Sequence, residues 1–79
     1  MARSASKPAA LDLDAPVASL RAYAGLTQVQ LAERRDIGQG SVSTAEKAGA
    51  AVSIATLRAY AAAAGLELEI VARKLAVLA

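Results

Sequence analysis

The chain has 79 residues and a net charge of +2, and it contains no His, Cys, Trp or Phe. The missing His and Cys remove the commonest general base, thiol nucleophiles, disulfides and the usual zinc ligands, so we expect no enzyme, no catalytic residue, no metal and no cofactor. Of the 79 residues, 22 are Ala, the strongest helix former. The length fits one small all-α domain, which dimerisation would help to stabilise.

Residues 1–12 form the expected N-terminal arm, because they lack hydrophobic periodicity. The arm carries Arg3 and Lys7, so it is either a disordered tail or a segment that touches DNA phosphates or a minor groove. Acidic residues break the first apolar run and charged residues interrupt the C-terminal one, so neither a secretory signal nor a membrane span is expected. We therefore expect a cytoplasmic protein with no membrane partner.

The first predicted helix lies between Asp14 and Gly25. Asp14 is a good N-cap, Pro16 suits the first helical turn, and Gly25 is a typical C-terminal residue. The second helix has the clearest start signal in the chain, because Thr27 and Gln30 fit a capping box. This helix is expected to end near residue 35, just before a three-residue turn.

A tight turn and a third helix follow. The turn is Asp36-Ile37-Gly38, and Asp adopts the left-handed backbone conformation more readily than most residues. The third helix is expected from Gln39 to Ala48, with Val42 facing inward. Its outer face is small, polar and nearly uncharged, and it holds Gln39, Gly40, Ser41, Ser43, Thr44 and Lys47.

The fourth predicted helix begins at the N-cap Ser53 and ends at Gly65. Its expected apolar side consists of Ile54, Leu57, Tyr60, Ala61 and Ala64.

After Gly65 the apolar period changes to two, which predicts a strand over residues 66–73. The alternative is a helix that continues through residues 66–79, and residues 74–79 fit either structure. A lone strand is unstable in water, so we expect residues 66–79 to pair with the same segment of a second copy. The residues expected at this dimer contact are Leu66, Leu68, Ile70 and Ala72.

Two short helices joined by a tight turn form a helix-turn-helix unit, whose second helix meets base edges in the major groove. Gln39 offers an amide that can pair with adenine, and Thr44 can donate, accept or touch a thymine methyl. Gln28 and Lys47 can reach phosphates. The alternative is that this polar face is only solvated surface.

Residues 20–49, LRAYAGLTQVQLAERRDIGQGSVSTAEKAG, resemble the Xre/Cro-type helix-turn-helix family, the group of the lambdoid phage repressors. The resemblance covers about residues 17–66 and implies a four-helix lambda-repressor-like domain over residues 13–65. It also implies a structural ion pair between Arg21 and Glu46. By this resemblance the base-reading residues are Gln39, Gly40, Ser41 and Thr44, and the phosphate contacts are Gln28, Ser43 and Lys47.

Several residues depart from the pattern of that family, among them Gly38, Gly40 and Thr44 in and beside the third helix. Asp36 stands where the family usually has Gly at the turn. Arg35 stands where helical spacing predicts an apolar residue, so we expect its stem to lie along the core with its charged head in water.

A strand directly after the fourth helix makes the chain resemble the short HipB-like antitoxins of type II toxin–antitoxin pairs. In those proteins the strands pair between subunits, the dimer represses its own operon, and the antitoxin binds a toxin. The resemblance therefore implies a homodimeric repressor that binds an inverted repeat in double-stranded DNA and has a cognate toxin as partner. The alternatives are an interaction module that mainly neutralises a toxin, and a stand-alone phage-type repressor.

Overall fold

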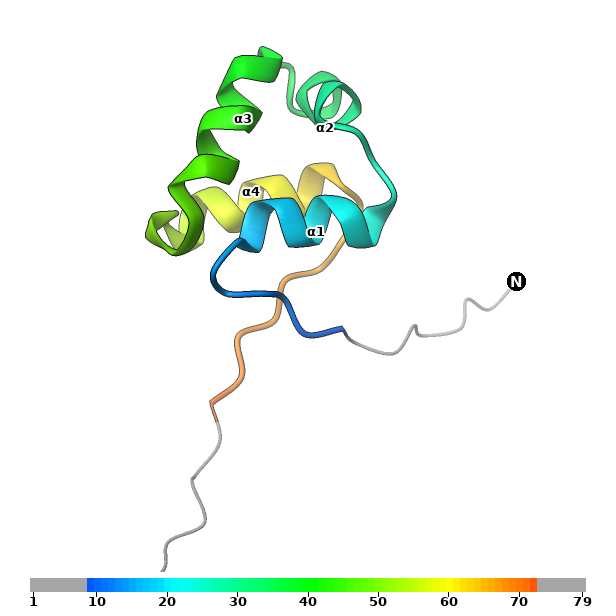
Figure 1. Cartoon of the computed structure of the whole chain (residues 1–79). Helices are drawn as coiled ribbons and strands as arrows, with labels where there is room; N and C mark the ends of the chain where they lie inside the picture. The colour runs from blue at the N-terminus through cyan, green and yellow to red at the C-terminus, as the bar shows by residue number, and fades with distance from the viewer. Residues whose placement is uncertain (1–8, 73–79) are drawn as a thin grey trace, which may run out of the picture.

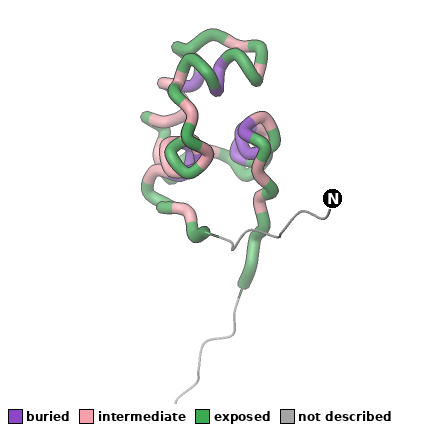
Figure 2. The backbone as a smooth tube through the Cα atoms, turned by 90° about the vertical axis from the view of Figure 1, so that its right-hand side faces the viewer, coloured by how far each residue is buried: buried purple, intermediate pink, exposed green. Residues whose placement is uncertain are grey.

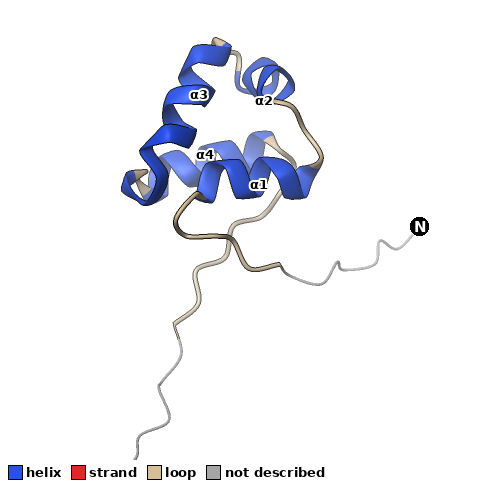
Figure 3. Cartoon of the chain, viewed as in Figure 1, coloured by secondary structure: helices blue, strands red, loops and turns tan. Residues whose placement is uncertain are grey.

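The computed structural model describes residues 9–72. Within this range the elements are α1 (Pro16–Ala24), α2 (Gln28–Arg35), α3 (Gln39–Ala48), the short 3-10 helix η1 (Gly49–Ala51) and α4 (Ile54–Ala63). The fold is all-α, as predicted (Figures 1 and 3). In Figure 1, α1 and α4 lie side by side, and α2 and α3 pack together on one side of that pair. Every helix within the described range is too short or too polar to cross a lipid bilayer.

The core forms where one face of each α-helix meets the others. Val17 and Leu20 of α1, Leu31 of α2 and Val42 of α3 are the most deeply buried large side chains, none more than 1% exposed. Figure 2 marks the buried positions along the helices. Burying an aliphatic side chain of this size contributes about 1.5–3 kcal/mol. The core is completed by Ala32, Leu57, Tyr60, Ala61 and Ala64.

Ile54 was predicted on this buried face, but the prediction is wrong because its side chain is 51% exposed. Ile54 is the first residue of α4. With Leu13 and Pro16 it lines an open apolar groove at the surface.

The predicted capping signals for α2 and α4 are confirmed. Thr27 Oγ1 accepts a hydrogen bond from the backbone N–H of Gln30 over 3.0 Å, and Gln30 Oε1 accepts from the backbone N–H of Thr27 over 2.8 Å. The hydroxyl of Ser53 accepts from the backbone N–H of Thr56 over 3.1 Å. These bonds satisfy donors that the first turn of a helix leaves without partners, so they fix where α2 and α4 begin.

The predicted cap of α1 is wrong by one residue. The N-cap is Ala15, which has no side chain able to accept a hydrogen bond. The preceding turn is organised instead by Asp12, whose Oδ1 accepts from the backbone N–H of Asp14 over 2.9 Å. Pro16 begins the helix and Gly25 ends it in the left-handed conformation, both as predicted.

The turn between α2 and α3 has the backbone that its sequence predicts. Asp36 is left-handed, with φ 58° and ψ 46°, and it is the non-glycine residue with positive φ in the described range. The backbone N–H of Ile37 returns to the carbonyl of Ala32 over 3.0 Å, which closes the end of α2. Gly38 then starts α3 at Gln39, so α2 and α3 form a helix-turn-helix unit.

Residues 66–72 form neither a strand nor a helix in the single chain. Leu66 and Leu68 are half-buried and pack against the core of their own domain, whereas Ile70 and Ala72 are exposed. The predicted strand is absent here because the described part of the chain offers no second strand with which these residues could pair. The predicted arm residues Arg3 and Lys7, and the tail from residue 73, lie outside the described residues.

Candidate nucleic-acid interface

The outer side of α3 is open to solvent. Val42 holds the helix to the core with a fully buried side chain, and Ser43 is half-buried. A β-carbon added to Gly40 would meet no atom within 4 Å, so nothing in the described part of the chain covers this position. The exposed residues on this side are Gln39, Gly40, Ser41, Thr44 and Lys47.

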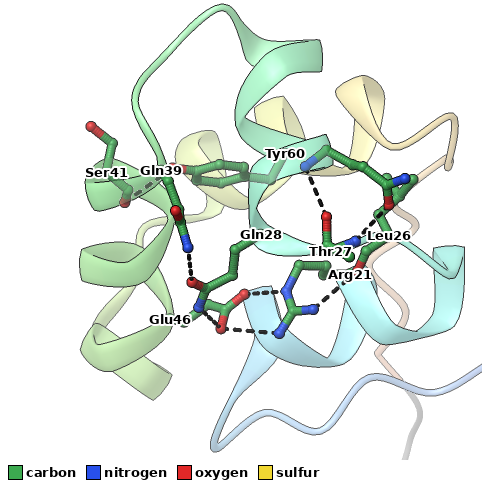
Figure 4. A network of polar contacts seen from close by, with 9 residues as sticks. Arg21, Leu26, Thr27, Gln28, Gln39, Ser41, Glu46 and Tyr60 are labelled. Carbon is green, nitrogen blue, oxygen red and sulfur yellow. Dashed lines mark hydrogen bonds and ion pairs between the residues drawn. The ribbon is translucent and has the colours of Figure 1, made fainter.

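A chain of side-chain hydrogen bonds links this outer face to the two neighbouring helices (Figure 4). Gln39 donates from Nε2 to Oε1 of Gln28 over 3.2 Å. Gln28 donates in turn from Nε2 to Oε1 of Glu46 over 2.9 Å. Glu46 then pairs with Arg21, so a residue of α1, one of α2 and two of α3 form one continuous polar network.

The Arg21–Glu46 ion pair anchors this network. Arg21 Nε lies 2.5 Å from Glu46 Oε2, and Arg21 Nη2 donates to Glu46 Oε1 over 3.3 Å. Arg21 also donates from Nη1 to the carbonyl of Leu26 over 3.0 Å. The side chains of Arg21 and Glu46 are 24% and 12% exposed. Because neither is fully buried, we expect the loss of one partner to cost about 1–3 kcal/mol.

The pKa shifts of both partners favour the charged pair. Burial raises the pKa of Glu46, but the hydrogen bonds from Arg21 and Gln28 outweigh it and hold this pKa below its ordinary value. The hydrogen bond to Glu46 raises the pKa of Arg21, against a smaller effect of burial. Glu46 is thus a carboxylate at neutral pH and can only accept hydrogen bonds.

The charge on Glu46 sets the direction of both amides. A carboxylate accepts only, so Gln28 must turn an N–H group toward Glu46, and in the structure its amide oxygen faces Gln39. Gln39 must then offer an N–H group to Gln28. This leaves one N–H and the amide oxygen of the exposed Gln39 side chain for other partners.

Two residues that the sequence analysis did not assign to this region also reach it. Tyr60 of α4 is only 3% exposed, and its hydroxyl donates to the carbonyl of Ser41 over 3.4 Å. The guanidinium carbon of Arg35 lies 4.8 Å from the centroid of the Tyr60 ring. The spacing of Tyr60 predicted a core residue, and nothing in the sequence indicated that its hydroxyl would meet α3.

Arg35 differs from its prediction. Its head stacks on an aromatic ring, and its Nε is buried without a hydrogen-bond partner among the described residues, so only part of the side chain lies in water. Arg35 thus faces the core at a position where helical spacing predicts an apolar residue. The ring of Tyr60 gives its guanidinium a favourable neighbour there.

The outer surface of α3 carries uncharged polar groups and little charge. It consists of neutral donors and acceptors on one exposed helix, with a single basic side chain, Lys47, at the far end of that helix. Within residues 9–72 no group of three or more His, Cys, Asp or Glu residues is placed to hold a metal ion. Comparison with known proteins finds no matching family, no similar curated protein and no similar solved structure.

Proposed function

We propose that this chain is a sequence-specific DNA-binding repressor of the Xre/Cro type, which acts as a homodimer on an inverted repeat. The observation that carries the proposal is the orientation of Gln39. Its amide lies at the exposed start of α3 and is held from behind by Gln28 and Glu46. If this polar face were only solvated surface, no hydrogen bonds would be needed to orient the amide of Gln39.

The two free groups on the Gln39 amide match adenine. In the major groove adenine presents the N7 acceptor beside the N6 amino donor, and a glutamine amide pairs with both. Gln28 already accepts one N–H of Gln39 and so restrains the rotation of the amide before it would meet the base. Gly40 and Ser41, which are small, let the backbone of α3 approach the groove closely.

Phosphate contacts would come from Gln28, Ser43 and Lys47. Gln28 lies at the first position of α2, where the helix dipole and the free backbone N–H groups favour an anion. Lys47 lies exposed near the C-terminal end of α3. With so few basic groups, we expect modest affinity that falls with added salt.

The dimer would be built by residues 66–79. Ile70 is 56% exposed, and the backbone of residues 66–72 is not used by any helix or strand of the chain. Antiparallel pairing with the same segment of a second copy would satisfy that backbone and cover Ile70. The two α3 helices would then face successive major grooves about 34 Å apart.

The antitoxin role of such a dimer rests on the resemblance of its C-terminal segment to HipB-like proteins. The weak net charge of +2 also favours a protein partner beside DNA. Co-purification of one stoichiometric partner with the chain expressed from its native operon would support this role. Recovery of the chain alone, with unchanged DNA binding, would favour a stand-alone repressor.

The DNA proposal is tested by binding site selection from a random duplex pool. We expect the wild-type chain to enrich an inverted repeat with adenine at a fixed position in each half. Gln39→Ala with Thr44→Ala should lose about 10- to 100-fold in affinity for that duplex and keep its non-specific binding. The control is Gln30→Ala, which removes an exposed glutamine of α2 that caps the helix and does not touch α3. Equal affinity and equal preference in the wild type and the double variant would remove α3 from the reading role.

A further inference from the structure

Tyr60 of α4 contacts both helices of the helix-turn-helix unit, α2 and α3. The guanidinium carbon of Arg35, the last residue of α2, lies over its ring at 4.8 Å from the ring centroid. Its hydroxyl donates to the carbonyl of Ser41, the third residue of α3. One buried side chain of α4 therefore touches the chain on both sides of the turn at residues 36–38 (the Ser41 contact is visible in Figure 4).

This placement matters because α3 has few other ties to α4. The helices that pack closely on α4 are α1 and α2, whereas α3 packs mainly on α2. The turn that joins α2 to α3 passes through a left-handed Asp36, a conformation that most residues avoid and that the surrounding structure must hold. A hydrogen bond from the core to the first turn of α3 restrains the direction in which α3 leaves that turn.

The bond also meets a need of Tyr60 itself. A buried tyrosine hydroxyl requires a hydrogen-bond partner. Phenylalanine at the same position would fill nearly the same space and has no hydroxyl that needs a partner. Tyr60 as a whole is 3% exposed, and its hydrogen bond to the Ser41 carbonyl is partly buried. The hydroxyl is thus the part of the residue that acts on α3, and the ring is the part that fills the core.

We propose that Tyr60 is a positioning residue for DNA reading, which sets the direction of α3 through its hydroxyl without touching DNA. This inference rests on the proposed function, because it assigns to the core a part in selecting the base sequence. It predicts that base selectivity depends on a group that lies behind the reading helix, on the side of α3 away from the DNA.

The test is Tyr60→Phe, compared with Ala61→Gly as a destabilising control at the neighbouring position of α4. Ala61 is buried, and a glycine there weakens the helix without removing a bond to α3. The measured quantity is the ratio of affinities for the duplex selected by the wild type and for a scrambled duplex of equal length. We expect Tyr60→Phe to lower this ratio about three- to tenfold, and Ala61→Gly to leave it unchanged at a temperature where both are folded.

A second readout uses the free protein and needs no DNA. Hydrogen exchange at the backbone amides of residues 37–41 should quicken in Tyr60→Phe by more than the change in global stability explains. An unchanged affinity ratio together with exchange that follows global stability alone would overturn the inference. If the wild type selects no duplex at all, the DNA proposal fails by itself, and the exchange measurement still decides whether Tyr60 holds α3.

Discussion

Gln28 donates a hydrogen bond to Glu46 over 2.9 Å, so a side chain at the start of α2 is fixed by one near the end of α3. The bond closes the helix-turn-helix unit at the end away from its turn. It also fixes which end of the Gln28 amide faces Gln39. The orientation of the exposed Gln39 amide is thereby tied, through Gln28, to the half-buried ion pair of Glu46 and Arg21.

The first prediction concerns the hydrogen bonds that Gln28 makes with Gln39 and Glu46. Gln28→Ala should lower the affinity for the selected duplex about three- to tenfold and weaken the preference for adenine opposite Gln39, because the Gln39 amide would then rotate freely. The measurement is a binding titration against the selected duplex and against single-base variants of it. Gln30→Ala lies two residues away on the same helix and serves as the control. A uniform loss of affinity across all variants would mean that Gln28 contributes only a phosphate contact.

The ion pair gives a pH prediction. The pKa of Glu46 in the folded chain lies below its ordinary value of 4.5, so the pair stabilises the fold above that value. This stabilisation is lost as the pH falls from about 4.5 through the lowered pKa. Arg21 stays protonated throughout this range, because its pKa is raised from an already high value. We therefore expect Glu46→Gln to be less stable than the wild type by about 1–3 kcal/mol at pH 7, with the gap closing toward pH 3.

Urea unfolding followed by circular dichroism between pH 7 and pH 3 measures this gap. Glu33→Gln is the charge-matched control, because it removes an exposed carboxylate of α2 that takes no part in the network. A gap between wild type and Glu46→Gln that stays constant down to pH 3 would show that the carboxylate of Glu46 is not stabilised by its partners.

The parts of the fold that the residues themselves predicted best are those fixed by neighbours in the chain, whereas the distant Arg21–Glu46 pair was expected only from the resemblance. The capping box at Thr27 and Gln30 and the left-handed Asp36 depend on a few adjacent residues, so their signals are local. The bond between Tyr60 and Ser41 joins residues 19 positions apart, and it exists only once α4 has packed under the turn. No periodicity in the sequence encodes such a contact.

The C-terminal segment shows a different limit. Alternation of apolar and polar residues placed Leu66 and Leu68 at a dimer contact, but in the described chain these two pack on their own core. A period of two indicates which residues share a side, and it does not indicate what that side faces. What covers that side depends on how the chain packs, and the period does not contain this information.

Two glycines in and beside α3 should respond to alanine in opposite directions. Gly49 has φ 56° and ψ −130°, and a β-carbon there would lie 2.8 Å from the carbonyl oxygen of Asp14. Gly49→Ala should therefore lower the free energy of unfolding by about 1–3 kcal/mol. Gly40 lies within α3, and a β-carbon there would meet no atom within 4 Å. Gly40→Ala should therefore raise the free energy of unfolding by about 0.5–1 kcal/mol. Thermal and urea unfolding of the two variants would measure both, and a loss of stability at Gly40 would contradict the assignment of that residue to a regular helix.

The last prediction tests the dimer contact that we propose for residues 66–79. Ile70 and Val71 are neighbours, and they are 56% and 64% exposed, so neither is needed for the fold of one chain. If residues 66–79 pair as strands with Ile70 on the covered side, Ile70→Asp should weaken the dimer at least about tenfold, since it places a charge in an apolar contact. Val71→Asp lies on the opposite side of the same strand and should leave the dimer intact. Sedimentation equilibrium over a range of protein concentrations measures both, with circular dichroism as the check on folding. Equal weakening by both substitutions would rule out strand pairing with this alternation, and no weakening by either would place the contact between copies elsewhere on the chain.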